Sequence, residues 1–216
     1  MRELKPRKTP DGKRAELKEQ RVLAIVKAAR NVLIEDGYRG LTMRAVADAS
    51  GISVGHVTYH FPRRLDLLEE LFERVFDEYL VEFERIRAEA GDDPRVELEE
   101  IVRFIFADLR TQETTVFFPE IWALANHEPA AAKFVDQIYV TERAAFAEII
   151  GRIHPRLSDS RIAILALYLS ATVEGHTMFV GHRKSFARRR KEAEELVVAG
   201  ILATVDRVAA ETQTST

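Results

Sequence analysis

Cysteine is absent from the 216 residues of the chain, which excludes a disulfide framework and a cysteine nucleophile. The motifs GxGxxG and HExxH and the Walker phosphate loop are absent as well. The longest apolar run, residues 162–173, is shorter than the about 20 residues of a membrane-spanning helix. The N-terminus lacks the apolar segment of a secretory signal. These absences argue against an enzyme and a membrane protein, and they favour a soluble protein of the reducing cytoplasm.

A metal site has little support in the sequence. His56 and His60 are four residues apart, a spacing at which one helix face can bind zinc, but no third ligand lies near them in sequence. No histidine follows a glutamate by three residues, so the pattern of a di-iron helix bundle is missing. We therefore expect no metal and no other cofactor.

The net charge of −3 is small, but the charges are unevenly divided. Residues 1–64 contain 14 Lys and Arg against 7 Asp and Glu, whereas the rest of the chain contains 18 against 28. A basic N-terminal third on an acidic remainder is typical of a protein whose one end faces the phosphates of a nucleic acid.

Apolar residues recur at helical spacing, and no strand alternation or internal repeat interrupts them. We predict an all-α fold of about nine helices. Residues 15–62 are expected to form a three-helix head and residues 63–210 a larger helical domain. Residues 1–14 read as a disordered basic arm, either lying along DNA or merely solvated, and residues 211–216 as a disordered polar tail.

The segment 41–61, LTMRAVADASGISVGHVTYHF, predicts a helix-turn-helix. Thr42 and Ser53 are placed to cap two short helices with their hydroxyl oxygens. Gly51 lies in the turn between them, where a positive φ favours glycine. Val57 and Phe61 are four residues apart and therefore face one side of the second helix. This unit places its second helix in the DNA major groove in many proteins, although similar helix pairs also serve as plain packing units.

Longer amphipathic helices are predicted on both sides of this segment. One covers residues 15–36 and ends at Gly37-Tyr38, and the other begins at Pro62 and continues to about Ala90. Arg63 and Arg64 in its first turn are either phosphate contacts or solvated side chains.

The run from Ala28 to Leu68 resembles the N-terminal domain of TetR-family transcriptional regulators. The pattern that carries the resemblance is Gly37-Tyr38, Thr42, Val46-Ala47, Gly51-Ile52-Ser53-x-Gly55, a helix closing at Phe61 and a basic residue near the next helix start. The chain departs from the family at Val54, His56 and Thr58, where members often carry Lys, a small Thr or Ala, and Tyr. These departures affect the readout of a DNA sequence more than the fold.

We expect the first short helix to anchor the chain on phosphates and the second to read bases. Residues from Ser53 to His56 should reach base edges, and Tyr59, His60 and Arg64 should hold phosphates. The complete predicted DNA-binding set is Thr42, Arg44, Ser53, Val54, Gly55, His56, Thr58, Tyr59, His60 and Arg64.

Five further helices are predicted, at about residues 95–111, 114–127, 129–153, 158–182 and 187–210, with Pro119 either beginning or kinking the second of them. Aromatic residues are frequent in this region, as in small-molecule pockets, although an aromatic at helical spacing is more often core. A charge directly after the apolar run is costly unless it is paired or lies beside a cavity. The predicted ligand-binding residues are Phe106, Phe118, Trp122, Tyr139, Tyr168, Glu174 and Phe179.

The helix containing residues 162–173 is apolar nearly all round, so it should be buried on more than one side. We predict a homodimer in which the last two helices pair with their symmetry mates, which is also where the family dimerises. The resemblance further implies that a ligand between the middle helices moves the helix 63–90 and lowers DNA affinity.

The sequence thus predicts a dimeric transcriptional regulator, a repressor rather than an activator, that binds a palindromic site in double-stranded DNA. Its effector is expected to be small and largely apolar or aromatic. Two other classes stay open: a non-specific architectural DNA-binding protein, and a helical carrier or enzyme that ignores DNA.

Overall fold

The computed structural model describes residues 10–214, and the prediction of an all-α fold is confirmed: no strand occurs in that range. The described part of the chain divides into two compact units, residues 10–72 and 73–214. The sequence predicted a boundary between residues 62 and 63. In the structure the boundary lies about ten residues later, between residues 72 and 73 inside α4 (Arg64–Ala90). The reason is that Leu67, Leu68 and Leu71, in the first turns of α4, are buried and belong to the first unit.

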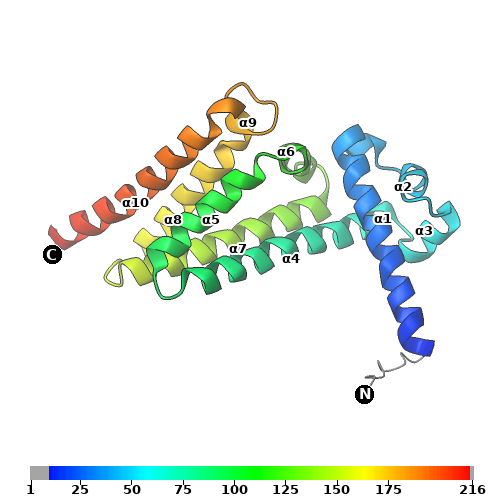
Figure 1. Cartoon of the computed structure of the whole chain (residues 1–216), viewed down its shortest axis with the longest axis horizontal. Coiled ribbons are helices and arrows are strands. Elements are labelled where there is room, and N and C mark those ends of the chain that lie inside the picture. The colour runs from blue at the N-terminus through cyan, green and yellow to red at the C-terminus, as the bar shows by residue number, and fades with distance from the viewer. Residues whose placement is uncertain (1–9, 215–216) are drawn as a thin grey trace, which may run out of the picture. The chain divides into compact units, whose positions relative to one another are not determined.

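The first unit contains α1 (Pro10–Gly40), α2 (Met43–Ser50) and α3 (Val54–His60), followed by the start of α4. α2 packs against both α1 and α3 (Figure 1). Gly37 interrupts the helical conformation of α1 with φ 68°, which glycine adopts without strain, so the last turn is set off where the sequence predicted a stop. The buried apolar residues of this unit include Ile25, Ala29, Val32, Leu33, Leu41, Val46 and Val57.

Both predicted disordered ends are partly wrong. α1 already begins at Pro10, because proline is tolerated in a first helical turn and residues 13–20, KRAELKEQ, are good helix formers. At the other end, α10 (Arg190–Thr214) continues through residues 211–214, and a 2.7 Å ion pair from Arg207 to Glu211 supports its last turns. The rest of the predicted arm and tail, residues 1–9 and 215–216, lies outside the described residues.

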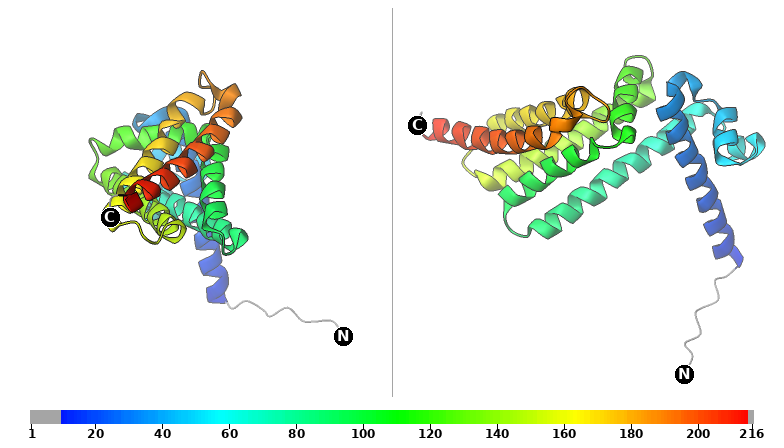
Figure 2. Two further views of the ribbon diagram at one scale, coloured as in Figure 1. Left: turned by 90° about the vertical axis from the view of Figure 1, so that its left-hand side faces the viewer. Right: turned by 45° about the horizontal axis from the view of Figure 1, so that its top comes forward.

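The second unit is a bundle of α5 (Pro94–Asp108), α6 (Gln112–Ala125), α7 (Pro129–Ile153), α8 (Asp159–Gly175) and α10, joined by the end of α4. α7 packs against α5, α6 and α8, and α10 packs against α5 and α8 (Figures 1 and 2). Its central buried side chains include Leu98, Phe106, Phe146, Ile149, Leu169, Val173, Ile201 and Val205.

Local signals set most helix starts in this bundle. Asp93 accepts hydrogen bonds from the first turn of α5, and Ser158 caps α8. Pro119 lies inside α6 and does not begin it. The helix predicted for residues 158–182 is wrong in length, because it is divided at His176 into α8 and the short α9 (Thr177–Val180).

The segment Asp159–Val180, formed by α8 and α9, is long and apolar enough to cross a membrane by length and composition alone. Its Leu165, Leu169 and Val173 nevertheless belong to the buried core of the second unit. This is the expected composition of a central helix in a soluble bundle.

Two ion-pair clusters tie helix ends together in the second unit. The buried carboxylate of Glu97 accepts from Arg87 of α4 at 2.9 Å and also from Arg152 of α7. Asp206 of α10 accepts from Arg95 at 2.6 Å and lies 2.7 Å from His154 Nε2. Because Arg87 is near the C-terminal end of α4, the first cluster fixes that end of the helix to α5 and α7.

Candidate DNA-binding surface and ligand pocket

The turn between α2 and α3 is built by local hydrogen bonds. Thr42 Oγ1 accepts from the Ala45 N–H at 3.1 Å, and Ser53 Oγ accepts from the His56 N–H at 3.4 Å, so both predicted caps are confirmed. Gly51 ends α2 in the left-handed conformation with φ 69°, as predicted. These caps fix where each short helix begins and therefore which of its residues point outward.

The two short helices bury only a narrow face. Val46 and Ala47 of α2 and Val57 of α3 are buried, and Phe61 closes α3 from the core side. On α3, this leaves Val54, Gly55, His56 and Tyr59 exposed, with the Tyr59 side chain 77 % exposed. An apolar valine and a large tyrosine held in water on a well-capped helix are typical of a surface that binds a partner.

The polar side chains of α3 differ in how much hydrogen-bonding capacity they leave unused. Ser53 Oγ lies 2.9 Å from His56 Nδ1, so the cap also orients the imidazole. Thr58 Oγ1 donates to the Val54 carbonyl at 2.9 Å, and its hydroxyl is therefore engaged within the helix. Thr42 and Arg44 are exposed on the α2 side of the same unit.

Arg64 has a structural role that the sequence did not indicate. Its Nη2 donates to the Tyr38 hydroxyl at 2.6 Å, and its guanidinium carbon lies 4.1 Å above the centre of the Tyr38 ring. The neighbouring Arg63 pairs with Asp66 through its side chain. Arg63, directly before α4, and Arg64, its first residue, therefore both have partners within the protein.

Positive charge gathers near the C-terminal end of α3. Burial lowers the pKa of His60, and the nearby cations Lys18 and Arg21 of α1, together with His56, lower this pKa further. Lys18 and Arg21 are exposed and were absent from the predicted set, because the sequence pattern did not show that the start of α1 lies near α3.

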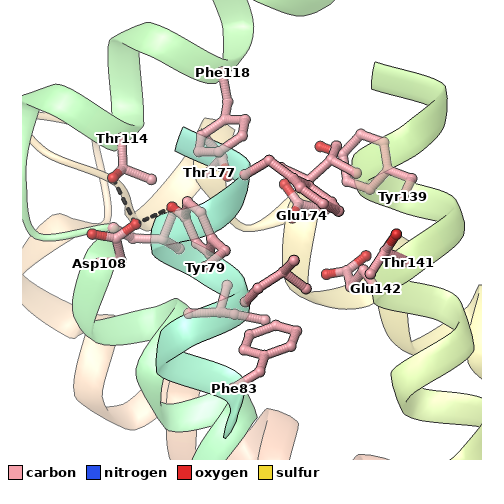
Figure 3. A pocket seen from close by; sticks show the side chains of 15 residues that line it. Tyr79, Phe83, Asp108, Thr114, Phe118, Tyr139, Thr141, Glu142, Glu174 and Thr177 are labelled. Atoms are coloured by element: carbon pink, nitrogen blue, oxygen red, sulfur yellow. Dashed lines mark hydrogen bonds between the residues drawn. The ribbon is translucent and has the colours of Figure 1, made fainter. Parts of the chain in front are cut away.

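The second unit encloses a cavity of about 50 Å³ between α4, α5, α6, α7 and α8. A single water molecule needs about 10–15 Å³, so the cavity has room for a small molecule. The side chains that line it are Phe76, Tyr79, Leu80, Phe83, Ile105, Asp108, Leu109, Thr114, Phe118, Ile138, Tyr139, Thr141, Glu142, Glu174 and Thr177 (Figure 3).

Acidic groups occur on two sides of this cavity, and none of the 15 lining residues is Lys, Arg or His. On one side, Asp108 Oδ2 accepts from the Tyr79 hydroxyl and, at 2.7 Å, from the Thr114 hydroxyl. Glu142 and Glu174 lie on the other side, next to Tyr139 (Figure 3). The Tyr79 ring also makes edge contacts with Phe104 and Phe118, at centroid distances of 5.8 and 5.7 Å.

Burial raises the pKa of both glutamates well above the usual range of the residue. For Glu174 the nearby Glu142 raises the pKa further, and a hydrogen bond with Tyr139 opposes this rise. For Glu142 the hydrogen bond from Ser170, with Oγ 2.6 Å from the carboxyl oxygen, and the charge of Arg143 oppose the rise. A carboxyl that resists ionisation in an empty apolar cavity is stabilised in its charged form when a cation arrives.

The predicted ligand-binding residues fall into three groups. Phe118, Tyr139 and Glu174 line the cavity, and Trp122 lies behind it, donating from Nε1 to the Tyr139 hydroxyl at 2.8 Å. Phe106 is fully buried and packs on His176 at a centroid distance of 5.0 Å. Tyr168 and Phe179 are 42 % and 61 % exposed and do not line the cavity, because they lie on the outer side of α8 and α9.

Sequence reasoning missed Tyr79, Asp108 and Glu142 as pocket residues. Each belongs to a different long helix, and no spacing in the sequence shows that these three meet at one cavity. Within the described part of the chain, no three His, Asp or Glu side chains are arranged to hold a metal ion. The carboxyls are thus distributed around the wall and are not gathered at one point.

Comparisons with known proteins fit this division into two units. Residues 25–71 match the model of bacterial regulatory proteins of the TetR family, and residues 94–206, more than half of the chain, match that of the BetI-type transcriptional repressor C-terminal domain. The HTH-type transcriptional regulator BetI of Stenotrophomonas maltophilia is 26 % identical over 152 residues, which cover 70 % of this chain and 76 % of the relative. BetI of Burkholderia thailandensis is 26 % identical over 160 residues, covering 74 % and 80 %.

Solved structures share the fold at lower identity. A transcriptional regulator from Pseudomonas aeruginosa has a TM-score of 0.71 at 19 % identity, covering 89 % of this chain and 92 % of its own. A regulator from Saccharomonospora viridis, solved in complex with choline, has a TM-score of 0.66 at 23 % identity, covering 83 % and 96 %.

Proposed function

The chain belongs to the TetR family of bacterial regulatory proteins, and from this premise we propose that it is a repressor released from its operator by a small organic cation. Its relatives are DNA-binding transcriptional regulators and not enzymes. The finer parts of the proposal are the palindromic operator, the homodimer, the DNA-contacting residues, the effector and the location in the cytoplasm.

The DNA-binding part of the proposal is supported by the exposed face of α3. Val54 and His56 project from a helix whose start is fixed by the Ser53 cap, so they can reach base edges in the major groove, while the exposed Tyr59 can hold a phosphate. Thr42 and Arg44 are positioned to bind the flanking phosphates. Arg64, held by Tyr38, is a pre-oriented cation at the start of α4.

The cavity in the second unit carries the proposal of a cationic effector. Three carboxyl groups line an aromatic cavity whose lining residues include no Lys, Arg or His, and Arg143 acts on Glu142 from outside this lining. Aromatic rings attract cations through their electron-rich faces, and buried carboxylates need a positive partner. The sequence predicted a small, largely apolar or aromatic effector. The carboxyl groups of the cavity add to this the proposal that the effector carries a positive charge. A quaternary ammonium compound has this chemistry, and the structural relative from Saccharomonospora viridis holds choline.

The contact between the cavity and α4 suggests how binding releases DNA. Four lining residues, Phe76, Tyr79, Leu80 and Phe83, belong to α4, the helix that begins in the first unit. A cation attracted to Asp108 competes with the hydrogen bond that Asp108 accepts from Tyr79. Loss of this bond frees α4 to shift beside the cavity while Arg87 holds its C-terminal end. A shift of this kind changes the placement of the DNA-binding heads and lowers operator affinity.

The first experiment selects bound sequences from a random duplex pool at about physiological salt. Recovery of a palindrome supports a dimeric, sequence-specific regulator, whereas retention of DNA without any motif supports an architectural protein. Failure to bind DNA after refolding, which removes any co-purified ligand, supports the carrier or enzyme alternative.

The second experiment uses the selected operator to test the effector. Choline is compared with its uncharged isostere, in which carbon replaces the quaternary nitrogen. Release by choline and not by the isostere supports recognition of charge, and Glu174→Gln should then weaken release. Equal release by the two compounds would contradict a cationic effector while leaving the assignment as a DNA-binding regulator intact.

A further inference from the structure

The first turns of α1 extend beyond the packed part of the first unit. Within residues 15–24 every side chain is exposed except Val22, which is half-buried, and the first buried residue of α1 is Ile25. Figures 1 and 2 show this part of α1 continuing past the α2–α3 pair. Residues 15–21 and 23–24 are exposed, so this segment contributes little to the core of the unit, and packing does not explain why it is helical.

The cations of this extension face the side of α1 that carries its buried residues. At 100° per residue, Lys18 and Arg21 lie seven and four residues before Ile25 and thus over the same face. Further along α1, this face carries the buried residues Ala29 and Val32. Lys27 is exposed as well, but it is about 180° around the helix from Lys18.

The same two cations are electrostatic neighbours of His60, the last residue of α3, as the lowered pKa of His60 indicates. The exposed Tyr59 ring packs edge-on against the His60 ring at a centroid distance of 5.3 Å. Lys18 and Arg21 of α1 and the C-terminal end of α3 are therefore neighbours within the first unit.

We infer that the N-terminal extension of α1 is a second DNA-contacting element, in which Lys18 and Arg21 bind backbone phosphates beside the major groove that α3 enters. This inference rests on the proposed function, because α3 defines where the duplex runs. DNA is favoured over an acidic protein as the occupant because these two cations neighbour the end of α3, the helix whose exposed face is proposed to read bases. Phosphate contacts of this kind strengthen binding to every sequence and carry no base preference.

Alanine substitutions at Lys18 and Arg21 test the inference, with Lys27→Ala as the matched control on the opposite side of α1. Alanine is the best helix former, so all three variants keep the helix, and circular dichroism checks this. Affinity for the selected operator and for a scrambled duplex is measured as a function of salt concentration. Each lost phosphate contact should reduce the slope of log K against log salt by about 0.9, so a substitution that removes one contact from each head of a dimer should reduce it by about 1.8.

Lys18→Ala and Arg21→Ala should each show this smaller slope and a similar fold loss of affinity on both duplexes, while Lys27→Ala matches the wild type. Slopes equal to that of Lys27→Ala would overturn the inference, and so would a loss confined to the operator, because that indicates base readout. These outcomes differ from failure of the proposed function, in which the wild-type protein itself does not prefer the operator.

Discussion

At the scale of single residues, two glycines in the helix-turn-helix have opposite roles. Gly51 has a positive φ of 69° at the end of α2, whereas Gly55 lies inside α3. A Cβ atom added at either position meets no atom within 4 Å. The consequences of substitution are therefore decided by the backbone and not by crowding.

We expect Gly51→Ala to destabilise the protein by about 1–2 kcal/mol, because an L-residue is strained in the left-handed region. Gly55→Ala should instead stabilise it by about 0.5–1 kcal/mol, because alanine loses less conformational entropy in a helix. Urea unfolding followed by circular dichroism measures both. Equal effects of the two substitutions would show that Gly51 does not adopt the left-handed conformation. Gly55→Ala should also weaken operator binding if α3 approaches the bases closely.

The raised pKa values of Glu142 and Glu174 predict a pH-dependent response to the effector. In the empty cavity, both carboxyls stay protonated above the ordinary glutamate pKa of about 4.3, and they ionise as the pH rises through their raised values. A cation binds the ionised form, so its affinity should rise with pH across that interval. The stability of the effector-free protein should fall as the pH rises from the ordinary glutamate pKa of about 4.3 to the raised values, because the unfolded chain ionises these carboxyls while the folded protein keeps them protonated.

Calorimetric titration with choline between about pH 5.5 and 8.5 tests this expectation. The groups that face the two glutamates are Tyr79, Asp108, Tyr139, Arg143 and Ser170. Glu174→Gln should flatten the pH profile, since it removes one of the titrating groups. An affinity that falls with rising pH would contradict a role for these carboxyls in cation binding.

At the scale of secondary-structure elements, α4 is the helix shared by the two units. It contributes part of the cavity wall through Tyr79, and its end is fixed to α5 and α7 by Arg87. Its first turns are buried in the first unit. α4 therefore contributes residues both to the cavity wall and to the core of the first unit.

Tyr79→Phe keeps the aromatic ring and removes the hydroxyl that donates to Asp108. We expect this variant to bind the effector but to release the operator poorly. Saturating effector typically lowers operator affinity about 5- to 150-fold, and in this variant it should lower the affinity about twofold or less. Operator binding is measured by fluorescence anisotropy with and without saturating effector, and effector binding by calorimetry.

Tyr139→Phe is the control for this change, because Tyr139 lies in the same cavity on α7 and not on α4. It should weaken effector binding while saturating effector still releases the operator as in the wild type. If both variants retained full release at saturation, the Tyr79–Asp108 hydrogen bond would have no part in transmission.

At the scale of the whole molecule, exposed apolar side chains lie on the helices expected to form a dimer. Ile164 and Leu167 of α8 are exposed, and Leu196 of α10 is 75 % exposed. α8 and α10 pack against each other, so their outer faces belong to one side of the bundle. Large apolar side chains kept in water on one face are typical of a surface that a second copy covers.

Leu167→Glu should therefore yield a monomer, because a charge in the middle of this face is desolvated on association. Val140→Glu, at an exposed apolar position of α7, is the matched control and should leave the dimer intact. Analytical ultracentrifugation gives the mass of each variant. A dimeric Leu167→Glu protein would show that the last two helices do not form the interface. Loss of the dimer should also lower operator affinity, because one recognition helix has a small footprint.

The sequence alone determined the helix-turn-helix and most helix boundaries. Thr42, Gly51 and Ser53 act through backbone groups three or four residues away. The helix starts and the turn that they form can therefore be predicted from the sequence spacing. The prolines at positions 94 and 129 likewise mark helix starts through their own fixed φ angle. The sequence did not predict the first turn of α1 and the last turn of α10, because charge and polarity were taken to indicate disorder. Residues 13–20 also have high helix propensity.

Only the tertiary structure decided which residues form the cavity. Long helices present several apolar faces, and the partner of each face depends on how the bundle packs. Tyr79, Asp108 and Glu142 therefore line one cavity although they lie far apart in sequence. Tyr168 and Phe179 were predicted to bind the ligand because they are aromatic residues of the middle helices, but they are exposed. Arg64 shows the same principle, because its partner Tyr38 is 26 residues away and no local pattern pairs them. Caps and turns depend on residues a few positions apart in the sequence, whereas a pocket depends on contacts between segments that are distant in the sequence.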